Sequence, residues 1–561
     1  VSSCRGAVRR VPRASFAPAL PAMAASPPVQ HGIIDDNGVL WKASSVGKFE
    51  TAIDSSVETL WDLARWRFAK DPSREAIGAR PVLERSFEAD PATGRQLEKL
   101  VLGDYEWATY SAFQAEVEAL AAGLGAEYGL KPKARVMIFA DTAKEWLAAA
   151  LAAWRQNMTI CTCYSTLGEA SVGYALRQTR VSVVLTQGNC LQLVSRVASS
   201  CPALKHVVVL NGAVTDEDTA AIAKAKLSLR TMAHVVSRGQ SAPVPEVPSK
   251  PTDTAVVMYT SGTTSEPKGV VLSHGALLAT VGGSVQPTSV LEEAPDIYEM
   301  TEADVFLCYL PLAHSFELVV ELVCFAKGAR LGYGHPQTLL ATSPRMKQTT
   351  PPQTGDAAAL KPTCMILAPA VLDRIYAGIS ARVRAGSAVK RGLFELGLRE
   401  GKARMARGLI GAGPVTNAVV FRTAQKLLGG NVRFLCAGSA PVSPPVQEFV
   451  QIVFNAPVRQ GYGLTETCAG TCLTRPADNS LGTVGVPQPS ACIRLRDWEE
   501  GNYKWADKDD PLVGMPRGEV LIGGPTLCDG YFNPGPFKDR TLSKLNRESF
   551  VTLDGVRYFC T

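Results

Sequence analysis

The sequence of 561 residues lacks several patterns that mark common classes of protein. Its 14 cysteines include no Cys-x-x-Cys pair and its six histidines do not cluster with them, so the spacing of a zinc site is absent. A disulfide framework is not expected in so long a chain, and we predict mostly buried thiols in a reducing compartment. No apolar run approaches the roughly 18 residues that span a bilayer. There is no internal repeat, and no Gly-x-Ser-x-Gly motif supports an α/β-hydrolase.

Acidic residues are missing from the start of the chain. The formal net charge is +6, and residues 1–32 contain four arginines and no acid, which leaves only +2 for the rest. A nearly neutral body does not indicate a nucleic-acid partner. The head, residues 1–32, is rich in Ala and Pro, and we expect it to be disordered. Its composition is typical of an organelle transit segment, and the alternative is extra sequence before a true start at Met23.

Beyond the head, strand-like and helix-like segments alternate. Apolar, β-branched runs begin near residues 135, 181 and 206, with helix-like stretches between them, and similar runs follow further along the chain. Ser111-x-x-Gln114 is a candidate capping box, and Ser443 followed by Pro444 is a candidate helix start. This alternation predicts an α/β fold with two mostly parallel, buried sheets.

The length of the chain predicts two or more hydrophobic cores. Short runs separated by Gly and Pro after about residue 480 indicate an antiparallel unit. The predicted order is a disordered head (1–32), a first α/β subdomain (33–250), a second α/β subdomain (251–479) and a small, incomplete β subdomain (480–561). Residues 213–252 and 339–361 are predicted to be surface loops.

The segment "YTSGTTSEPKG", residues 259–269, has the composition of a phosphate-binding loop. Glycines let backbone N–H groups approach an anion, hydroxyls add donors, and Lys268 adds positive charge. The segment is not a Walker A motif, because Pro267 stands where that motif needs glycine and Gly269 follows the lysine. By itself, the segment is also compatible with a Ser/Thr-rich surface turn that binds nothing.

Three further segments accompany this loop: "YLPLAHSFE" (309–317), "AGSAPVSPPV" (437–446) and "QGYGLTET" (460–467). The four segments, in this order, resemble the adenylate-forming superfamily, which includes acyl-CoA synthetases, luciferases and peptide-synthetase adenylation domains. "LPLAHSFEL", "GYG" near residue 332 and "DTAKEWLAAALAAWRQN" (141–157) are similar to long-chain fatty acyl-CoA synthetases. The resemblance implies ATP-dependent conversion of a long-chain fatty acid to an acyl-adenylate and then to acyl-CoA, with release of pyrophosphate and AMP.

The resemblance also implies which residues bind ATP. The β- and γ-phosphates would be held by Thr260, Ser261, Gly262, Thr263, Thr264 and Lys268. The adenine would lie against Gly438, Ser439 and Ala440, and would stack on Tyr462 between Gly461 and Gly463.

The remaining implied roles concern the reaction itself. Thr465 would bond the α-phosphate, and Thr260 and Glu466 would ligate Mg²⁺, which prefers oxygen ligands. His314 would lie near the reacting carboxylate, and coenzyme A would be the co-substrate. For single residues the alternatives are a buried, hydrogen-bonded histidine at 314 and a surface carboxylate at 466. His274 is expected to pack the loop.

Other functions remain open on the same fold. One alternative is a ligase for a medium-chain or aromatic acid, and another is a non-catalytic, nucleotide-binding relic. The resemblance implies fatty acid, ATP and coenzyme A as partners. We expect peripheral membrane association at the cytoplasmic face of the endoplasmic reticulum, with a plastid as the alternative location because of the Arg-rich head. The sequence leaves the oligomeric state open.

The sequence ends at Thr561. In the family, the threonine at this place is followed by Gly-Asp, whose aspartate holds the ribose hydroxyls, and then by a hinge and a small lid domain with a lysine for adenylation. We therefore expect a fragment that is inactive, or nearly so, by itself.

Ser265 stands where the family usually has glycine. A serine in the left-handed conformation costs roughly 1–2 kcal/mol, and the neighbouring Glu266 adds negative charge near phosphate. We predict a looser loop and weaker ATP binding, so Ser265→Gly should lower the KM for ATP when acid-dependent pyrophosphate release is measured in a chain that includes the lid domain. An unchanged KM together with unchanged turnover would contradict this prediction.

Overall fold

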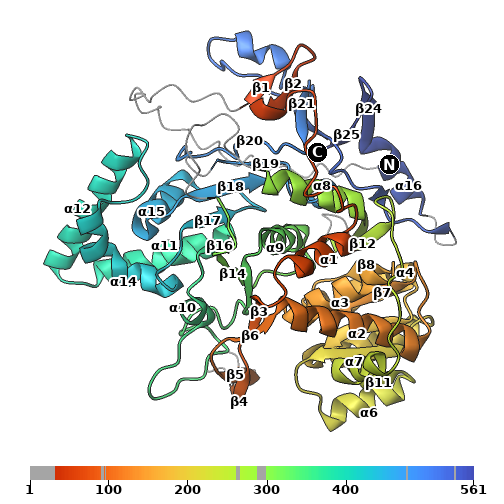
Figure 1. Ribbon diagram of the computed structural model, residues 1–561. Coiled ribbons are helices and arrows are strands. Elements are labelled where there is room, and N and C mark those ends of the chain that lie inside the picture. The colour runs from red at the N-terminus through yellow and green to blue at the C-terminus, as the bar shows by residue number, and fades with distance from the viewer. Residues whose placement is uncertain are drawn as a thin grey trace, which may run out of the picture. The chain divides into compact units, whose positions relative to one another are not determined.

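The computed structural model describes residues 32–89, 94, 96–260, 266–286, 299–475, 478–535 and 539–561. Within these residues the strands form three larger sheets and one two-stranded hairpin (Figure 1). The hairpin consists of β4 (Val82–Ala89) and β5 (Gln96–Leu102). The predicted α/β fold, with two mostly parallel sheets and a smaller antiparallel one, is confirmed.

The first sheet contains eight strands within the described residues. Their spatial order is β11 (Ser228–Thr231), β10 (His206–Asn211), β9 (Val183–Gln187), β7 (Arg135–Phe139), β8 (Thr159–Thr162), β12 (Thr254–Thr260), β13 (Lys268–Ser273) and β23 (Gly530–Tyr531). The strands from β11 to β12 pair in parallel, and the last two pair antiparallel. The strands β7, β9 and β10 are apolar and buried, as expected for a sheet that is covered on both faces.

The second sheet contains nine of the described strands. Their order is β20 (Val486–Pro487), β19 (Cys472–Leu473), β18 (Val458–Tyr462), β17 (Phe434–Ala437), β16 (Cys364–Ile366), β14 (Val305–Cys308), β15 (Arg330–Tyr333), β3 (Glu75–Ala79) and β6 (Glu106–Thr109). The centre of the sheet, from β18 to β3, is parallel.

The third sheet is antiparallel and unites distant parts of the chain. Its order is β1 (Gly32–Ile34), β2 (Val39–Lys42), β21 (Cys492–Arg496), β22 (Glu519–Gly523), β25 (Val556–Cys560) and β24 (Phe550–Leu553). The small antiparallel unit predicted after residue 480 is therefore present. No local pattern predicted that β1 and β2 would join it.

Helices cover the two large sheets. The helices up to residue 285 are α1 (Leu60–Lys70), α2 (Tyr110–Tyr128), α3 (Lys144–Arg155), α4 (Glu169–Thr179), α5 (Leu191–Val197), α6 (Asp216–Lys224), α7 (Met232–Ser241) and α8 (His274–Val285). The later helices are α9 (Ser315–Lys327), α10 (Asp356–Leu360), α11 (Pro369–Arg384), α12 (Ala388–Met405), α13 (Pro414–Thr416), α14 (Arg422–Gln425), α15 (Pro444–Phe454) and α16 (Arg540–Glu548). No helix in the described part of the chain combines the length and apolar composition that a membrane crossing requires.

Two predicted helix starts can be compared with the structure. Helix α2 is capped by Thr109, whose hydroxyl oxygen accepts a hydrogen bond from the Ala112 N–H at 3.2 Å, so the predicted capping box at Ser111 lies two residues too late. Ser443 does precede α15 with proline at the first helical position, but its side chain accepts no capping hydrogen bond. The Ser443–Pro444 signal therefore located the start of α15 correctly, whereas the predicted capping box placed the start of α2 too late.

One predicted loop and one predicted boundary do not match the observed elements. Residues 213–252 were expected to be a surface loop, but they contain α6, β11 and α7. Their few apolar residues, such as Ile222 and Val235, are buried, which a short and mostly polar stretch did not reveal. The predicted subdomain boundary at residue 250 does not separate the sheets either, because β12 and β13 belong to the first sheet and β3 and β6 to the second. The division into subdomains stays a prediction.

The thiols follow the expectation from the sequence. All thirteen described cysteines are free, eleven of them are buried and two are partly buried. Burial raises the pKa of the Cys161 thiol to about 12. The Cys161 thiol therefore stays protonated and behaves as a small apolar side chain.

Helices α2 and α7 pack so closely that glycine is required at their contact. An ideal Cβ on Gly123 would lie 1.9 Å from the carbonyl oxygen of Val235, whereas one on Gly125, in the same helix, has its nearest neighbour at 4.0 Å. We expect Gly123→Ala to destabilise the protein by about 2 kcal/mol or more. The matched variant Gly125→Ala should stabilise it by about 1 kcal/mol, because alanine favours helix. Unfolding monitored by circular dichroism measures both, and equal effects would contradict the packing described.

Candidate active site

A cavity of about 370 Å³ lies between α8, α9 and the strands β17 to β19. It brings together eight of the residues singled out in the sequence. They are Thr260, His314, Gly438, Ser439, Gly461, Gly463, Thr465 and Glu466. The predicted residues Ser261, Gly262, Thr263 and Thr264 lie outside the described residues, as does Ser265.

The cavity extends along the second sheet. Gly438 follows the carboxyl end of β17, Gly461 lies in β18, and both line the cavity, as expected for a ligand site at the carboxyl ends of parallel strands. Phe434, at the other end of β17, lines it too, so the cavity runs along the length of this strand, about 13 Å. Thr260 ends β12 of the first sheet, so both large sheets contribute to the site.

His314 is the residue directly before α9. Its Nδ1 accepts a hydrogen bond from the Phe316 N–H at 3.1 Å, and burial lowers the pKa of the imidazole. A neutral ring whose Nδ1 accepts must carry its proton on Nε2. His314 therefore offers the cavity a neutral N–H donor.

Glu466 is held by a tyrosine that the sequence analysis did not single out. The Tyr531 hydroxyl donates to Glu466 Oε1 at 2.8 Å, and burial together with the adjacent carboxylate raises the pKa of the tyrosine. Lys268 Nζ lies 5.7 Å from the centroid of the same ring. Tyr531 therefore connects Lys268 to Glu466, although Lys268 itself does not line the cavity. "GYF" at residues 530–532 carried no motif that marked this role.

The turn after β17 adopts an unusual backbone conformation. Ser439 has φ = 69°, in the left-handed region that non-glycine residues rarely adopt, and it is exposed where it lines the cavity. Ala440 is exposed and lies outside the lining. Strained backbone of this kind is often retained at ligand sites.

The residues around Tyr462 differ from the expected arrangement. Its ring packs against Ile522, Leu527 and Phe559 of the third-sheet region, and it does not line the cavity. An ideal Cβ on Gly463 would lie 1.8 Å from the Ala469 carbonyl oxygen. The glycine at 463 is therefore required by the backbone that folds back over it. Stacking of Tyr462 on a base stays a prediction.

His274 has the packing role expected for it. It is fully buried, its Nδ1 accepts from the Leu60 N–H at 3.3 Å, and its ring meets Trp154 edge-on. Burial lowers the pKa of His274 to about 4, so the ring is neutral at neutral pH.

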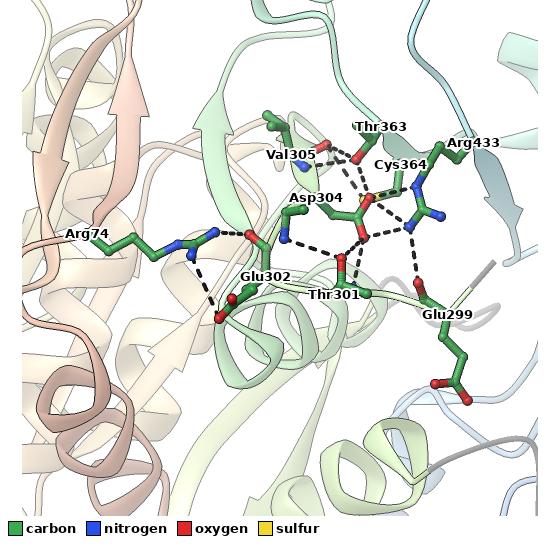
Figure 2. Close-up of polar contacts among 10 residues, drawn as sticks. Arg74, Glu299, Thr301, Glu302, Asp304, Val305, Thr363, Cys364 and Arg433 are labelled. Atoms are coloured by element: carbon green, nitrogen blue, oxygen red, sulfur yellow. Dashed lines mark hydrogen bonds and ion pairs between the residues drawn. The ribbon is translucent and has the colours of Figure 1, made fainter. Parts of the chain in front are cut away.

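Asp304 links the amino ends of three neighbouring strands of the second sheet (Figure 2). The carboxylate accepts from Arg433 Nη2 at 2.7 Å and from the Thr363 hydroxyl at 2.6 Å. Asp304, Thr363 and Arg433 directly precede β14, β16 and β17. Arg433 also donates to the carbonyl oxygen of Glu299, a cavity residue, at 3.1 Å. This network therefore fixes one wall of the cavity to the sheet.

Comparison with known proteins identifies the family. The sequence matches the AMP-binding enzyme family over residues 87–532. The chain belongs to this family. It is 36% identical over 485 residues to "Long chain acyl-CoA synthetase 8" of Arabidopsis thaliana, covering 85% of this chain and 64% of that protein. It is 32% identical over 514 residues to "Long-chain-fatty-acid--CoA ligase 1" of Schizosaccharomyces pombe, covering 89% and 71%. The chain thus spans about two thirds of the length of these relatives.

Solved structures share the fold of this AMP-binding enzyme. The A-PCP didomain of carboxylic acid reductase from Segniliparus rugosus, in complex with AMP, aligns with a TM-score of 0.67 at 20% identity, covering 91% of this chain and 64% of that one. A long-chain-fatty-acid-CoA ligase from Archaeoglobus fulgidus aligns with a TM-score of 0.60 at 16% identity, covering 91% and 82%. At these identities the similarity concerns the fold.

Helix α9 of this AMP-binding enzyme buries two carboxyl groups one turn apart. Glu317 Oε1 accepts from the Tyr309 N–H at 3.2 Å, and Glu321 Oε2 accepts from the Tyr333 hydroxyl at 2.7 Å. Burial raises the pKa of both groups, and for Glu317 the neighbouring Glu321 raises it further. The remaining oxygens, Glu317 Oε2 and Glu321 Oε1, have no hydrogen-bond partner. The pair is therefore protonated over the neutral range.

The raised pKa values make stability depend on pH. A carboxyl that keeps its proton in the folded state but loses it when unfolded stabilises the fold fully below its ordinary pKa of 4.5, and this stability is lost as the pH rises through the raised value. We expect the melting temperature to fall less for Glu321→Gln than for the wild type between about pH 5 and pH 8. Glu395→Gln, at an exposed carboxyl, should follow the wild type. If the melting temperatures of Glu321→Gln and the wild type changed in parallel with pH, Glu321 would not keep its proton in the folded state.

Proposed function

We propose that this AMP-binding enzyme uses ATP to activate a long-chain fatty acid, first as the acyl-adenylate and then as acyl-CoA, with release of pyrophosphate and AMP. The observation that carries the proposal is an apolar stripe on α9 that begins beside His314 and runs along the cavity. The names of the two relatives at 36% and 32% identity support the same chemistry.

The stripe consists of cavity-lining residues at helical spacing. They are Phe316, Val319, Val320 and Val323. Lys327 ends both the stripe and the helix, thirteen residues after His314, a rise of about 20 Å. An extended alkyl chain fits such a stripe, because each buried CH₂ contributes about 0.8 kcal/mol. The acid's carboxylate would then lie at the His314 end, near the residues implied in nucleotide binding.

The residues at that end have roles that match their chemistry. Neutral His314 would donate its Nε2 proton to a carboxylate oxygen and orient it for attack on the α-phosphate. Thr465 would donate to the α-phosphate, and Lys268 with the loop that follows Thr260 would neutralise the leaving pyrophosphate. A site that repels water and offsets the charge of two anions lowers the barrier by positioning, and no covalent enzyme intermediate is required.

Mg²⁺ would suit the oxygen atoms in this cavity. Tyr531 occupies only Oε1 of Glu466, which leaves Oε2, and the Thr260 hydroxyl lines the same cavity. Mg²⁺ is usually held by one or two protein oxygens together with phosphate oxygens and water. Among the described residues, no group of three or more His, Cys, Asp or Glu side chains could hold a metal without such help.

The width of the cavity at Val323 tests the proposal. We expect Val323→Phe to weaken binding of a sixteen-carbon acid at least tenfold and to leave an eight-carbon acid nearly unaffected, because the added ring fills the stripe away from His314. Val323→Ala, which enlarges the same position, should keep the long acid. Displacement of a fluorescent fatty acid measures affinity in this 561-residue chain.

Other outcomes would identify other functions. Preference for benzoate or an eight-carbon acid in the wild type would favour an aromatic or medium-chain ligase. Binding of nucleotide without binding of any acid would favour a non-catalytic relic. Equal losses of both acids in Val323→Phe would overturn the assignment of the stripe.

A further inference from the structure

One segment carries more positive charge than the chain as a whole. Residues 382–426 contain ten Lys and Arg and two Glu, a net charge of +8, whereas the complete chain has +6. The other residues therefore sum to −2. This charge is distant in sequence from the arginines of the head, and none of the residues implied in the reaction lies within it.

Helix α12, in this segment, exposes an apolar stripe. Val389, Leu393 and Leu396 follow each other at spacings of four and three residues and are 71%, 45% and 62% exposed. The opposite face is anchored: Phe394 is buried, and its ring lies 5.2 Å from that of Phe421. The helix is thus held firmly by one face while three large apolar side chains point away from the core.

The next helical segment continues this surface. Val415 and Val419 are 78% and 71% exposed and lie one turn apart, in α13 and the π-helix Asn417–Phe421. Glu400 of α12 accepts hydrogen bonds from the Gly413 N–H, at 3.0 Å, and from the Thr416 hydroxyl. The two segments are therefore fixed next to each other, and their exposed apolar residues form one rigid set.

The basic residues around this set are mostly available to a partner. Eight of them are exposed and form no ion pair within the described residues. They are Arg382, Arg384, Lys390, Arg391, Arg399, Arg407, Arg422 and Lys426. Lys402 is neutralised by Glu448, at 2.7 Å. Arg422 and Lys426 follow Val419 at three and seven residues, and so share its side of the helical segment.

We propose that α12 and residues 415–419 dock this protein onto the surface of an anionic phospholipid bilayer. Exposed apolar side chains on a helix lying in the interface insert among acyl chains, and flanking lysines and arginines attract anionic headgroups. Charge alone would equally suit a nucleic acid, but a nucleic acid gives no reason for five large apolar side chains at 45–78% exposure. An acidic protein as the partner would leave the chain unbound to lipid vesicles, which the experiment below tests. A bilayer accounts for both features.

The inference deepens the proposed function, because a long-chain acid partitions into bilayers and a docked enzyme would meet it there. It does not depend on that function, since the surface is separate from the cavity. Binding to vesicles and binding of acid or nucleotide can therefore fail independently.

Flotation of the purified chain with phosphatidylcholine vesicles, with and without phosphatidylserine, tests the proposal. We expect binding to the anionic vesicles that weakens with salt. Two variants should each bind the anionic vesicles at least fivefold more weakly than the wild type. They are the apolar variant Leu393→Ser/Leu396→Ser/Val419→Ser and the charge variant Arg399→Glu/Arg422→Glu. The head with its four arginines is present in every variant, so a difference between variants reports on this surface.

Matched controls alter similar residues elsewhere. Leu83→Ser/Phe87→Ser removes apolar side chains that are 67% and 64% exposed on β4, and Lys224→Glu/Arg540→Glu reverses two exposed charges. Both should bind vesicles like the wild type, and all variants should keep the wild-type melting temperature and nucleotide affinity. The proposal is overturned if the wild type does not bind anionic vesicles, or if the control variants lose as much affinity for them as the test variants. It is also overturned if the apolar variant binds anionic vesicles as well as the wild type does, because binding would then depend on charge alone, as for a polyanion such as heparin.

Discussion

The hydrogen bonds of two buried carboxyl groups on α9 determine how this helix is rotated about its own axis. Glu317 accepts from the N–H of Tyr309, the residue directly after β14, and Glu321 accepts from the hydroxyl of Tyr333 in β15, so the face that carries them is fixed against the second sheet. The opposite face, with Val319 and Val323, then lines the cavity. Rotation of the helix would move a carboxyl group out of reach of its donors and leave it buried without a partner, which is costly. The lining of the cavity therefore depends on polar contacts outside it.

The two ends of the second sheet have different tasks. At the amino ends, the Asp304 carboxylate holds three strands together with the help of Arg433 and Thr363. At the carboxyl ends the chain leaves the sheet in tight turns, where Ser439 adopts a left-handed conformation. A rigid end can support strain at the opposite end, because the strands cannot move apart to relieve it. The cavity extends from the amino ends to the carboxyl ends of these strands. Its lining is therefore held by the Asp304 network at one end and formed by turns at the other.

Local patterns predicted the α/β class, most strands and the order of the site segments, because buried parallel strands are apolar over their whole length. The resemblance of four segments to the adenylate-forming superfamily implied that Thr260, His314 and Glu466 would lie in one site, and all three line the same cavity. Tyr531 was missed because its contact with Glu466 comes from the pairing of β23 with β13, about 260 positions earlier, which no local pattern records. The placement of Tyr462 against the third-sheet region was missed for the same reason.

The pairing of β2 with β21 has a consequence for how the protein is made. Val39 lies opposite Arg494, so β2 is synthesised 455 residues before the strand with which it pairs. The last strands of that sheet, β24 and β25, come at the very end of the sequence. β1 pairs with one side of β2, but during synthesis the side that later pairs with β21 is an open edge, exposed to pairing with other chains. Of the three larger sheets described, the third is therefore the last whose strands are all synthesised, and newly made chains depend on its closure to hide that edge.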